Sequence, residues 1–211
     1  MLPVLSEIKS RGSEIGDAVR KSIQISSFVV FPMMGILMAS ADHLIQLLLG
    51  SSWISSVPYL QIACVFYIFQ PLQSINWQVL KALGKGDLCI KLELIKKAAC
   101  FLLLIVAVPH GVLAIAIASA LSGLFSSLIN MFPVKKLIGY GLRDQVLDIL
   151  KPLFATTVVV VVSILLPDFT MHPMLGLIIQ VVVGSIVYLV VSRLIECEGL
   201  RMIVDKMQRD K

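Results

Sequence analysis

The chain has 211 residues, of which 58% are hydrophobic and 15% are charged, and its formal net charge at pH 7 is +5. A soluble domain carries charge on about a quarter of its residues, so a chain this apolar would expose large adhesive patches in water. The composition therefore predicts an integral membrane protein and argues against a soluble enzyme, a disordered segment or a nucleic-acid-binding domain.

Six apolar stretches approach or exceed the length of about 20 helical residues that crosses a bilayer. In chain order, we expect membrane-spanning helices at about 22–41, 58–80, 92–109, 112–133, 152–167 and 173–193. Residues 1–21 mix charges at helical spacing and predict a cytoplasmic amphipathic helix, and 194–211 are expected to form a cytoplasmic tail. The fold class expected is an all-α integral membrane protein, a six-span helical bundle.

Two of these regions predict more than a simple span. Small residues fill 112–133, which predicts a central helix with close neighbours. Residues 135–151, between the fourth and fifth spans, have the amphipathic pattern of a helix lying on the cytoplasmic surface.

The placement of charge predicts the orientation. All 18 Lys and Arg residues fall in the N-terminal tail, in the second loop and its flank, in the fourth loop, or in the C-terminal tail. The other three loops hold the three histidines, His43, His110 and His172, together with Asp42 and Asp168. Because basic loops stay in the cytoplasm, both termini of this multi-pass protein are expected there. Attraction to anionic membrane lipids explains the basic excess without a nucleic-acid partner.

The second span is the most polar and supplies the candidate site. Gln70, Gln73, Trp77 and Lys81 are spaced by three, four and four residues and so share one helical face, with Asn76 beside it. Polar side chains at membrane depth face the protein interior or a wet cavity. Two interpretations stay open, a face that lines a substrate cavity and a set of hydrogen bonds between helices.

Catalytic chemistry has no visible place in this sequence. There is no G-x-S-x-G, P-loop or H-E-x-x-H motif, and no ionisable residue lies near the centre of a span. The histidines fall in separate loops, which favours solvated side chains over a metal site, and nothing ties the external aspartates into an acid–base pair. The four cysteines lack metal-ligand spacing and are expected to be packing residues: Cys64, Cys89, Cys100 and Cys197. We therefore expect no catalytic residue, cofactor or metal.

Several local patterns resemble Wzx-type polysaccharide flippases, of the superfamily that includes multidrug extruders, over about residues 1–135. They are LPVLSEIKS with the following RGSEIGDAVRKSIQ, Pro32 in VVFPMMG, LIQLLLGSSWISSVPYLQIA, KALGKGD and HGVLAIAIA. The second half of such a flippase is the part resembled, and the chain has about half the length that the family pattern leads us to expect.

The resemblance implies a two-lobed helical transporter that works by alternating access around a central cavity. It implies a protein of the bacterial inner membrane whose substrate is of the undecaprenyl-diphosphate-linked oligosaccharide class, flipped for lipopolysaccharide or exopolysaccharide assembly. Lys81 would then either contact the diphosphate or serve orientation alone. A missing N-terminal lobe or a second copy would be a partner. The alternatives are a non-transporting membrane partner, that is, a structural half-protein, and a membrane-embedded polysaccharide-assembly enzyme.

Overall fold

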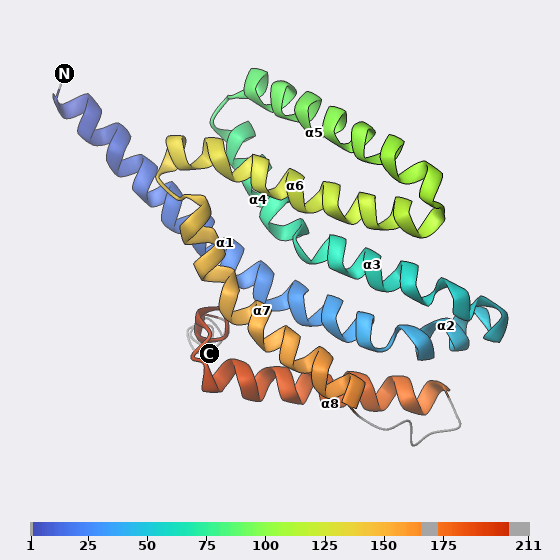
Figure 1. Ribbon diagram of the computed structural model, residues 1–211. Coiled ribbons are helices and arrows are strands. Elements are labelled where there is room, and N and C mark those ends of the chain that lie inside the picture. The colour runs from blue at the N-terminus through green and yellow to red at the C-terminus, as the bar shows by residue number, and fades with distance from the viewer. Residues whose placement is uncertain (1, 166–172, 203–211) are drawn as a thin grey trace. The chain divides into compact units, whose positions relative to one another are not determined.

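The computed structural model describes residues 2–165 and 173–202, with side chains described from Glu14 onward. Every regular element in these ranges is a helix (Figure 1). In chain order they are α1 (Leu2–Ala39), α2 (Ala41–Leu49), η1 (Ser51–Ser56), α3 (Val57–Ile68), α4 (Gln70–Ala82), α5 (Gly86–Ala107), η2 (Val108–His110), α6 (Val112–Ile138), α7 (Leu142–Leu165) and α8 (Pro173–Leu194). Asp168, His172 and the end of the predicted tail lie outside the described residues.

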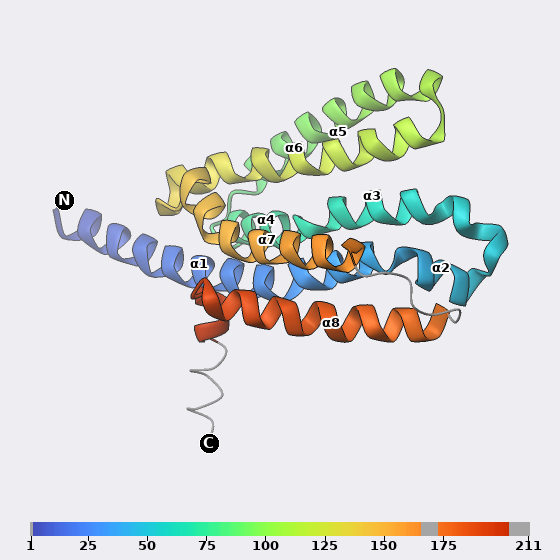
Figure 2. The same cartoon turned by 60° about the horizontal axis from the view of Figure 1, so that its bottom comes forward.

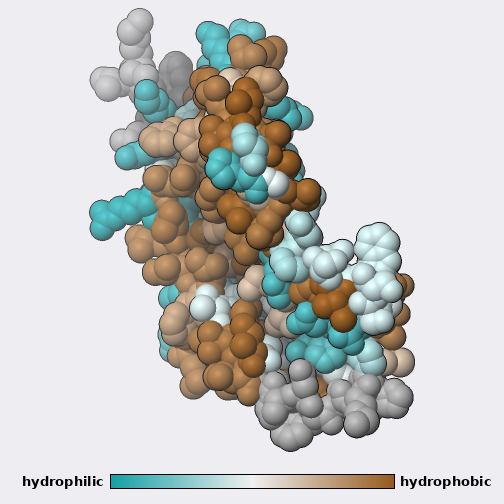
Figure 3. Space-filling model, turned by 45° about the vertical axis from the view of Figure 1, so that its right-hand side comes forward, coloured by the Kyte–Doolittle hydropathy of each residue, from teal (hydrophilic) through white to brown (hydrophobic). Residues whose placement is uncertain are grey.

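Among the residues that the structure describes, five helical stretches are long and apolar enough to cross a membrane: Glu14–Ala39, Ser51–Ala82, Val112–Ile138, Leu142–Leu165 and Pro173–Leu194. Much of the face shown in Figure 3 is hydrophobic, with hydrophilic residues gathered in separate patches. The prediction of an all-α membrane protein is therefore confirmed. The number of spans stays a prediction, because α5 is a continuous 22-residue helix whose first twelve residues include five charges, at Asp87, Lys91, Glu93, Lys96 and Lys97.

The polar stretch expected as one helix at 58–80 consists of two. Helix α3 ends at Ile68, α4 begins at Gln70, and Phe69 between them has φ −90° and ψ 0°. Pro71 explains the interruption, since proline has no N–H to donate to the preceding turn and is favoured in the first turn of a new helix, where it lies in α4.

The amphipathic stretch 135–151 also differs from the expected separate surface helix. Helix α6 continues through Lys135 and Lys136 to Ile138, and α7 begins at Leu142 and runs on to Leu165. Gly139 ends α6 with φ 76°, and its N–H donates to the Lys135 carbonyl at 3.0 Å. A left-handed residue at this position is the usual glycine helix end. The amphipathic pattern therefore reflects one helix end, a turn and the first turns of the next helix.

The chain divides into two compact units, which are described separately. The first contains the residues up to Ser26 together with Phe69–Ile149. In it α5 and α6 form an antiparallel hairpin, as both views show (Figures 1 and 2), and α6 also packs along α4. The buried face of α6 carries Ala118, Ser122, Ser126 and Asn130 at four-residue spacing. The close neighbours predicted for this helix are thus present in α4 and α5, whereas its central position in a bundle stays a prediction.

The second unit contains Ser27–Ile68 and the residues from Leu150 onward. Its core joins α1, α7 and α8 through Phe28, Ala155, Val159 and Tyr188. The Phe28 and Tyr188 rings lie 5.2 Å apart, and the Tyr188 hydroxyl donates to the Phe28 carbonyl at 2.8 Å. Satisfying this hydroxyl inside an apolar cluster removes the cost of burying it.

Candidate functional site on helix α4

Helix α4 carries all five residues singled out from the sequence, at different depths. Gln70 and Lys81 are exposed, Gln73 and Trp77 are half-buried, and Asn76 is fully buried. Because α4 is helical from Gln70 to Ala82, the spacing of three and four residues does place four of them along one side.

Asn76 lies away from that side and pairs with another helix of the same unit. Its Nδ2 donates to Oε1 of Gln145 in α7 at 2.8 Å, and Gln145 Nε2 donates back to Asn76 Oδ1 at 3.1 Å. Both residues have no exposed surface. For Asn76 the arrangement is therefore a hydrogen bond between helices, which satisfies two amides that would be costly to bury alone.

Two positively charged side chains lie close to the ring of Trp77. Lys81 Nζ lies 5.5 Å from the centroid of the Trp77 ring, and Lys96 Nζ of α5 lies 4.7 Å from it. Both distances are within the range of about 6 Å in which an indole ring attracts a cation. Two ammonium groups from two helices thus share one aromatic ring.

Lys96 is the residue that sequence reasoning missed. It is 5% exposed and forms an ion pair with Glu93, three residues earlier on α5. The 93–96 spacing is visible in the sequence and indicates such a pair. That α5 places Lys96 against Trp77 is not visible there, since it depends on how two helices pack.

The site offers amide groups, an aromatic ring and two cations, one of which already has a carboxylate partner. These groups can bind a polar or anionic ligand through hydrogen bonds, ring contact and charge. The arrangement is suited to recognition.

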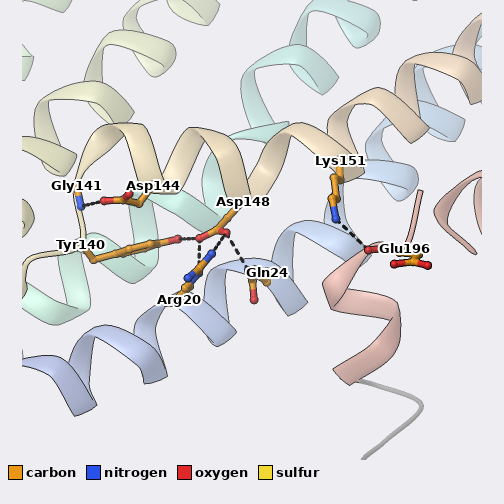
Figure 4. A network of polar contacts seen from close by, with 8 residues as sticks. All are labelled: Arg20, Gln24, Tyr140, Gly141, Asp144, Asp148, Lys151 and Glu196. Atoms are coloured by element: carbon orange, nitrogen blue, oxygen red, sulfur yellow. Dashed lines mark hydrogen bonds and ion pairs between the residues drawn. The ribbon is translucent and has the colours of Figure 1, made fainter. Parts of the chain in front are cut away.

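A second polar cluster in the same unit centres on Asp148 of α7 (Figure 4). Its carboxylate accepts hydrogen bonds from Arg20 Nε at 2.8 Å and Nη2 at 2.7 Å, from Gln24 Nε2 at 3.0 Å, and from the Tyr140 hydroxyl at 2.7 Å. The Asp148 side chain is 5% exposed, whereas Arg20 is 48% exposed. The cluster fastens the first part of α1 to the start of α7 by satisfying a buried carboxylate with donors from three residues, two on α1 and one directly before α7.

The surroundings of Tyr140 change its proton affinity. Burial raises the pKa of its hydroxyl well above the ordinary value, and the hydrogen bond to Asp148 and the charge of that carboxylate raise it further. The hydroxyl therefore stays protonated and donates to Asp148 at all ordinary pH values.

Comparison with known proteins gives two curated relatives. The chain is 26% identical over 192 residues to the teichuronic acid biosynthesis protein TuaB of Bacillus subtilis (strain 168), a match that covers 89% of this chain and 40% of TuaB. It is 24% identical over 168 residues to the lipopolysaccharide biosynthesis protein WzxC of Escherichia coli (strain K12), covering 77% of this chain and 34% of WzxC. The chain thus spans well under half the length of these relatives.

A family model described as a polysaccharide biosynthesis protein matches residues 1–58. No solved structure matches the chain. The resemblance expected from the sequence motifs is confirmed by these matches: the chain is similar, over part of their length, to proteins of polysaccharide biosynthesis.

Proposed function

We propose that this chain is part of a membrane transporter for lipid-linked oligosaccharides. It moves an undecaprenyl-diphosphate-linked oligosaccharide from the cytoplasmic to the periplasmic leaflet of the bacterial inner membrane, for lipopolysaccharide or exopolysaccharide synthesis, with no covalent chemistry. The observation that carries the proposal is the match of 192 residues, in order along an apolar helical chain, to TuaB.

The proposal assigns the site on α4 to substrate binding. Gln70 and Gln73 offer hydrogen bonds to sugar hydroxyls, and Trp77 offers a ring face to a sugar. Lys81, supported by Lys96, offers charge to the diphosphate. Asn76 holds α4 in place against α7 through its hydrogen bond with Gln145.

The proposal also sets orientation and partners. Both termini and the basic loops lie in the cytoplasm, because these segments hold all 18 Lys and Arg residues. The chain spans 40% of TuaB and 34% of WzxC, so the rest of the cavity comes from another segment, either a first lobe or a second copy of this chain.

Deleting the gene in its native host tests the transport role. Lipid-linked oligosaccharide should accumulate in the cytoplasmic leaflet while surface polysaccharide falls, and a plasmid copy should reverse both changes. Loss of an enzyme that builds the lipid-linked unit would instead leave none to accumulate. Normal surface polysaccharide in the deletion strain would contradict the proposal.

Complementation with variants then tests the site. Lys81→Gln and Trp77→Ala should lower the rate of polysaccharide export by about tenfold, about 1.4 kcal/mol of barrier, at an unchanged protein level in the membrane. Lys85→Gln is the matched control, since it removes an exposed lysine that lies outside α4, directly before α5. Equal export by all three variants would remove α4 from the proposed binding site.

A further inference from the structure

A cavity of about 790 Å³ lies at the end of α8, separate from the site on α4 and lined only by residues of the second unit. Its charged lining consists of three cations and two carboxylates: Lys151, Arg193, Arg201, Glu196 and Glu198. Leu189 and Leu200 add apolar surface. The volume is within the range of about 300–1,000 Å³ that is typical of small-molecule sites.

The cavity lies where two membrane helices meet the polar boundary. Lys151 directly precedes the uncharged run 152–165 of α7, and Arg193 directly follows the uncharged run 173–192 of α8. Lys151 Nζ donates to the Glu196 carbonyl at 3.1 Å, so these two ends adjoin (Figure 4). A run of 20 helical residues crosses about 30 Å of hydrocarbon, so the cavity is at the depth of lipid headgroups.

Glu196 has a left-handed backbone conformation that glycine adopts more easily than glutamate does. Its φ is 51°, and it ends α8 with the Glu196 N–H donating to the Arg193 carbonyl and the Cys197 N–H donating to the Ser192 carbonyl. Glycine is usual at this left-handed position, and a carboxylate there also opposes the negative end of the helix dipole. A costly backbone conformation of this kind is a reason to look for function at the site.

The mixture of charges narrows the chemistry of the ligand. Three cations attract a phosphate, since charge-assisted hydrogen bonds to phosphate oxygens are among the strongest. The two carboxylates of the same lining repel a purely anionic headgroup and attract an ammonium group that can donate hydrogen bonds. Burial raises the pKa of the nearby Cys197 thiol, which keeps this group neutral in the wall.

We propose that this cavity binds the zwitterionic headgroup of phosphatidylethanolamine from the surrounding bilayer. Lys151, Arg193 and Arg201 hold the phosphate, while Glu196 and Glu198 accept hydrogen bonds from the ammonium group. The apolar side chains contact the start of the acyl chains. The lipid is a structural or regulatory ligand of the second unit and is distinct from the transported substrate.

Native mass spectrometry of the delipidated chain in detergent tests this assignment. Titration with phosphatidylethanolamine, phosphatidylcholine, phosphatidylglycerol and undecaprenyl diphosphate should give the tightest binding for phosphatidylethanolamine. Arg193→Gln/Arg201→Gln should weaken that binding by about tenfold. Glu196→Gln/Glu198→Gln should abolish the preference for phosphatidylethanolamine over phosphatidylglycerol. The second variant keeps all three cations, so the two results separate the two halves of the headgroup.

Lys135→Gln/Lys136→Gln is the matched control, because it removes two exposed cations from the last turn of α6 in the other unit. It should leave the binding of phosphatidylethanolamine unchanged. A preference of the wild-type chain for phosphatidylglycerol or undecaprenyl diphosphate would overturn the assignment, as would equal effects of the control and the arginine variants. Soluble phosphoethanolamine, titrated in the same way, should bind far more weakly than phosphatidylethanolamine. Equal binding of the two would overturn the assignment of a bilayer lipid.

Discussion

Replacing Asp148 with asparagine should lower the free energy of unfolding by about 2–4 kcal/mol. The carboxylate of Asp148 accepts four hydrogen bonds, two from Arg20 and one each from Gln24 and Tyr140, at 2.7–3.0 Å. A hydrogen bond to a charged group contributes about 1.5–3 kcal/mol. The two bonds from Arg20 count for less, because its side chain is 48% exposed and water screens its charge. Asparagine keeps one acceptor oxygen but turns an amide donor toward groups that already donate.

The assay is unfolding of the purified chain in detergent, followed by circular dichroism. Asp144→Asn is the matched control, because Asp144 is exposed, lies one turn earlier on α7 and accepts the Gly141 N–H at 3.1 Å. We expect this control to cost about 0.5–1 kcal/mol. Combining Asp148→Asn with Tyr140→Phe should cost less than the sum of the two single changes, by about 1 kcal/mol, since they share one hydrogen bond. Equal losses for Asp148→Asn and Asp144→Asn, or strict additivity, would refute the reasoning.

Three further predictions follow from other contacts. Because the pKa of Tyr140 is raised in the folded chain, the folded chain keeps a proton that the unfolded chain loses above about pH 10. The free energy of unfolding should therefore fall as the pH rises beyond that value, and it should fall less steeply in Tyr140→Phe. Parallel pH profiles of the two chains would contradict this. Glu196→Gly should stabilise the chain by about 0.5–1 kcal/mol in the same unfolding assay by relieving the positive φ, whereas Glu196→Ala should not, and equal effects would rule out backbone strain. In Gly35→Ala the new Cβ would lie 2.4 Å from the Thr156 Cγ2, so the free energy of unfolding should fall by about 1–3 kcal/mol. Adding Thr156→Ser removes that methyl group and should largely restore the stability. No restoration would refute the contact.

Residue spacing in the sequence predicts part of the candidate site on α4. Spacing alone places Gln70, Gln73, Trp77 and Lys81 on one side of a helix, and α4 has the required helical geometry. The proline at position 71 indicates the break before it. The fully buried Asn76 is different, because whether its amide faces a cavity or a neighbouring helix depends on what packs behind α4.

The amino-acid sequence by itself determined that this chain is a helical membrane protein, because the length and apolarity of a run are local properties and hydrocarbon tolerates few other structures. Only the tertiary structure decided which polar groups meet: Asp148 with Arg20, 128 positions away, and Lys96 with Trp77. Such pairs depend on which helices are neighbours and how each is rotated about its axis, and an apolar run on a helix buried in lipid carries little information about either.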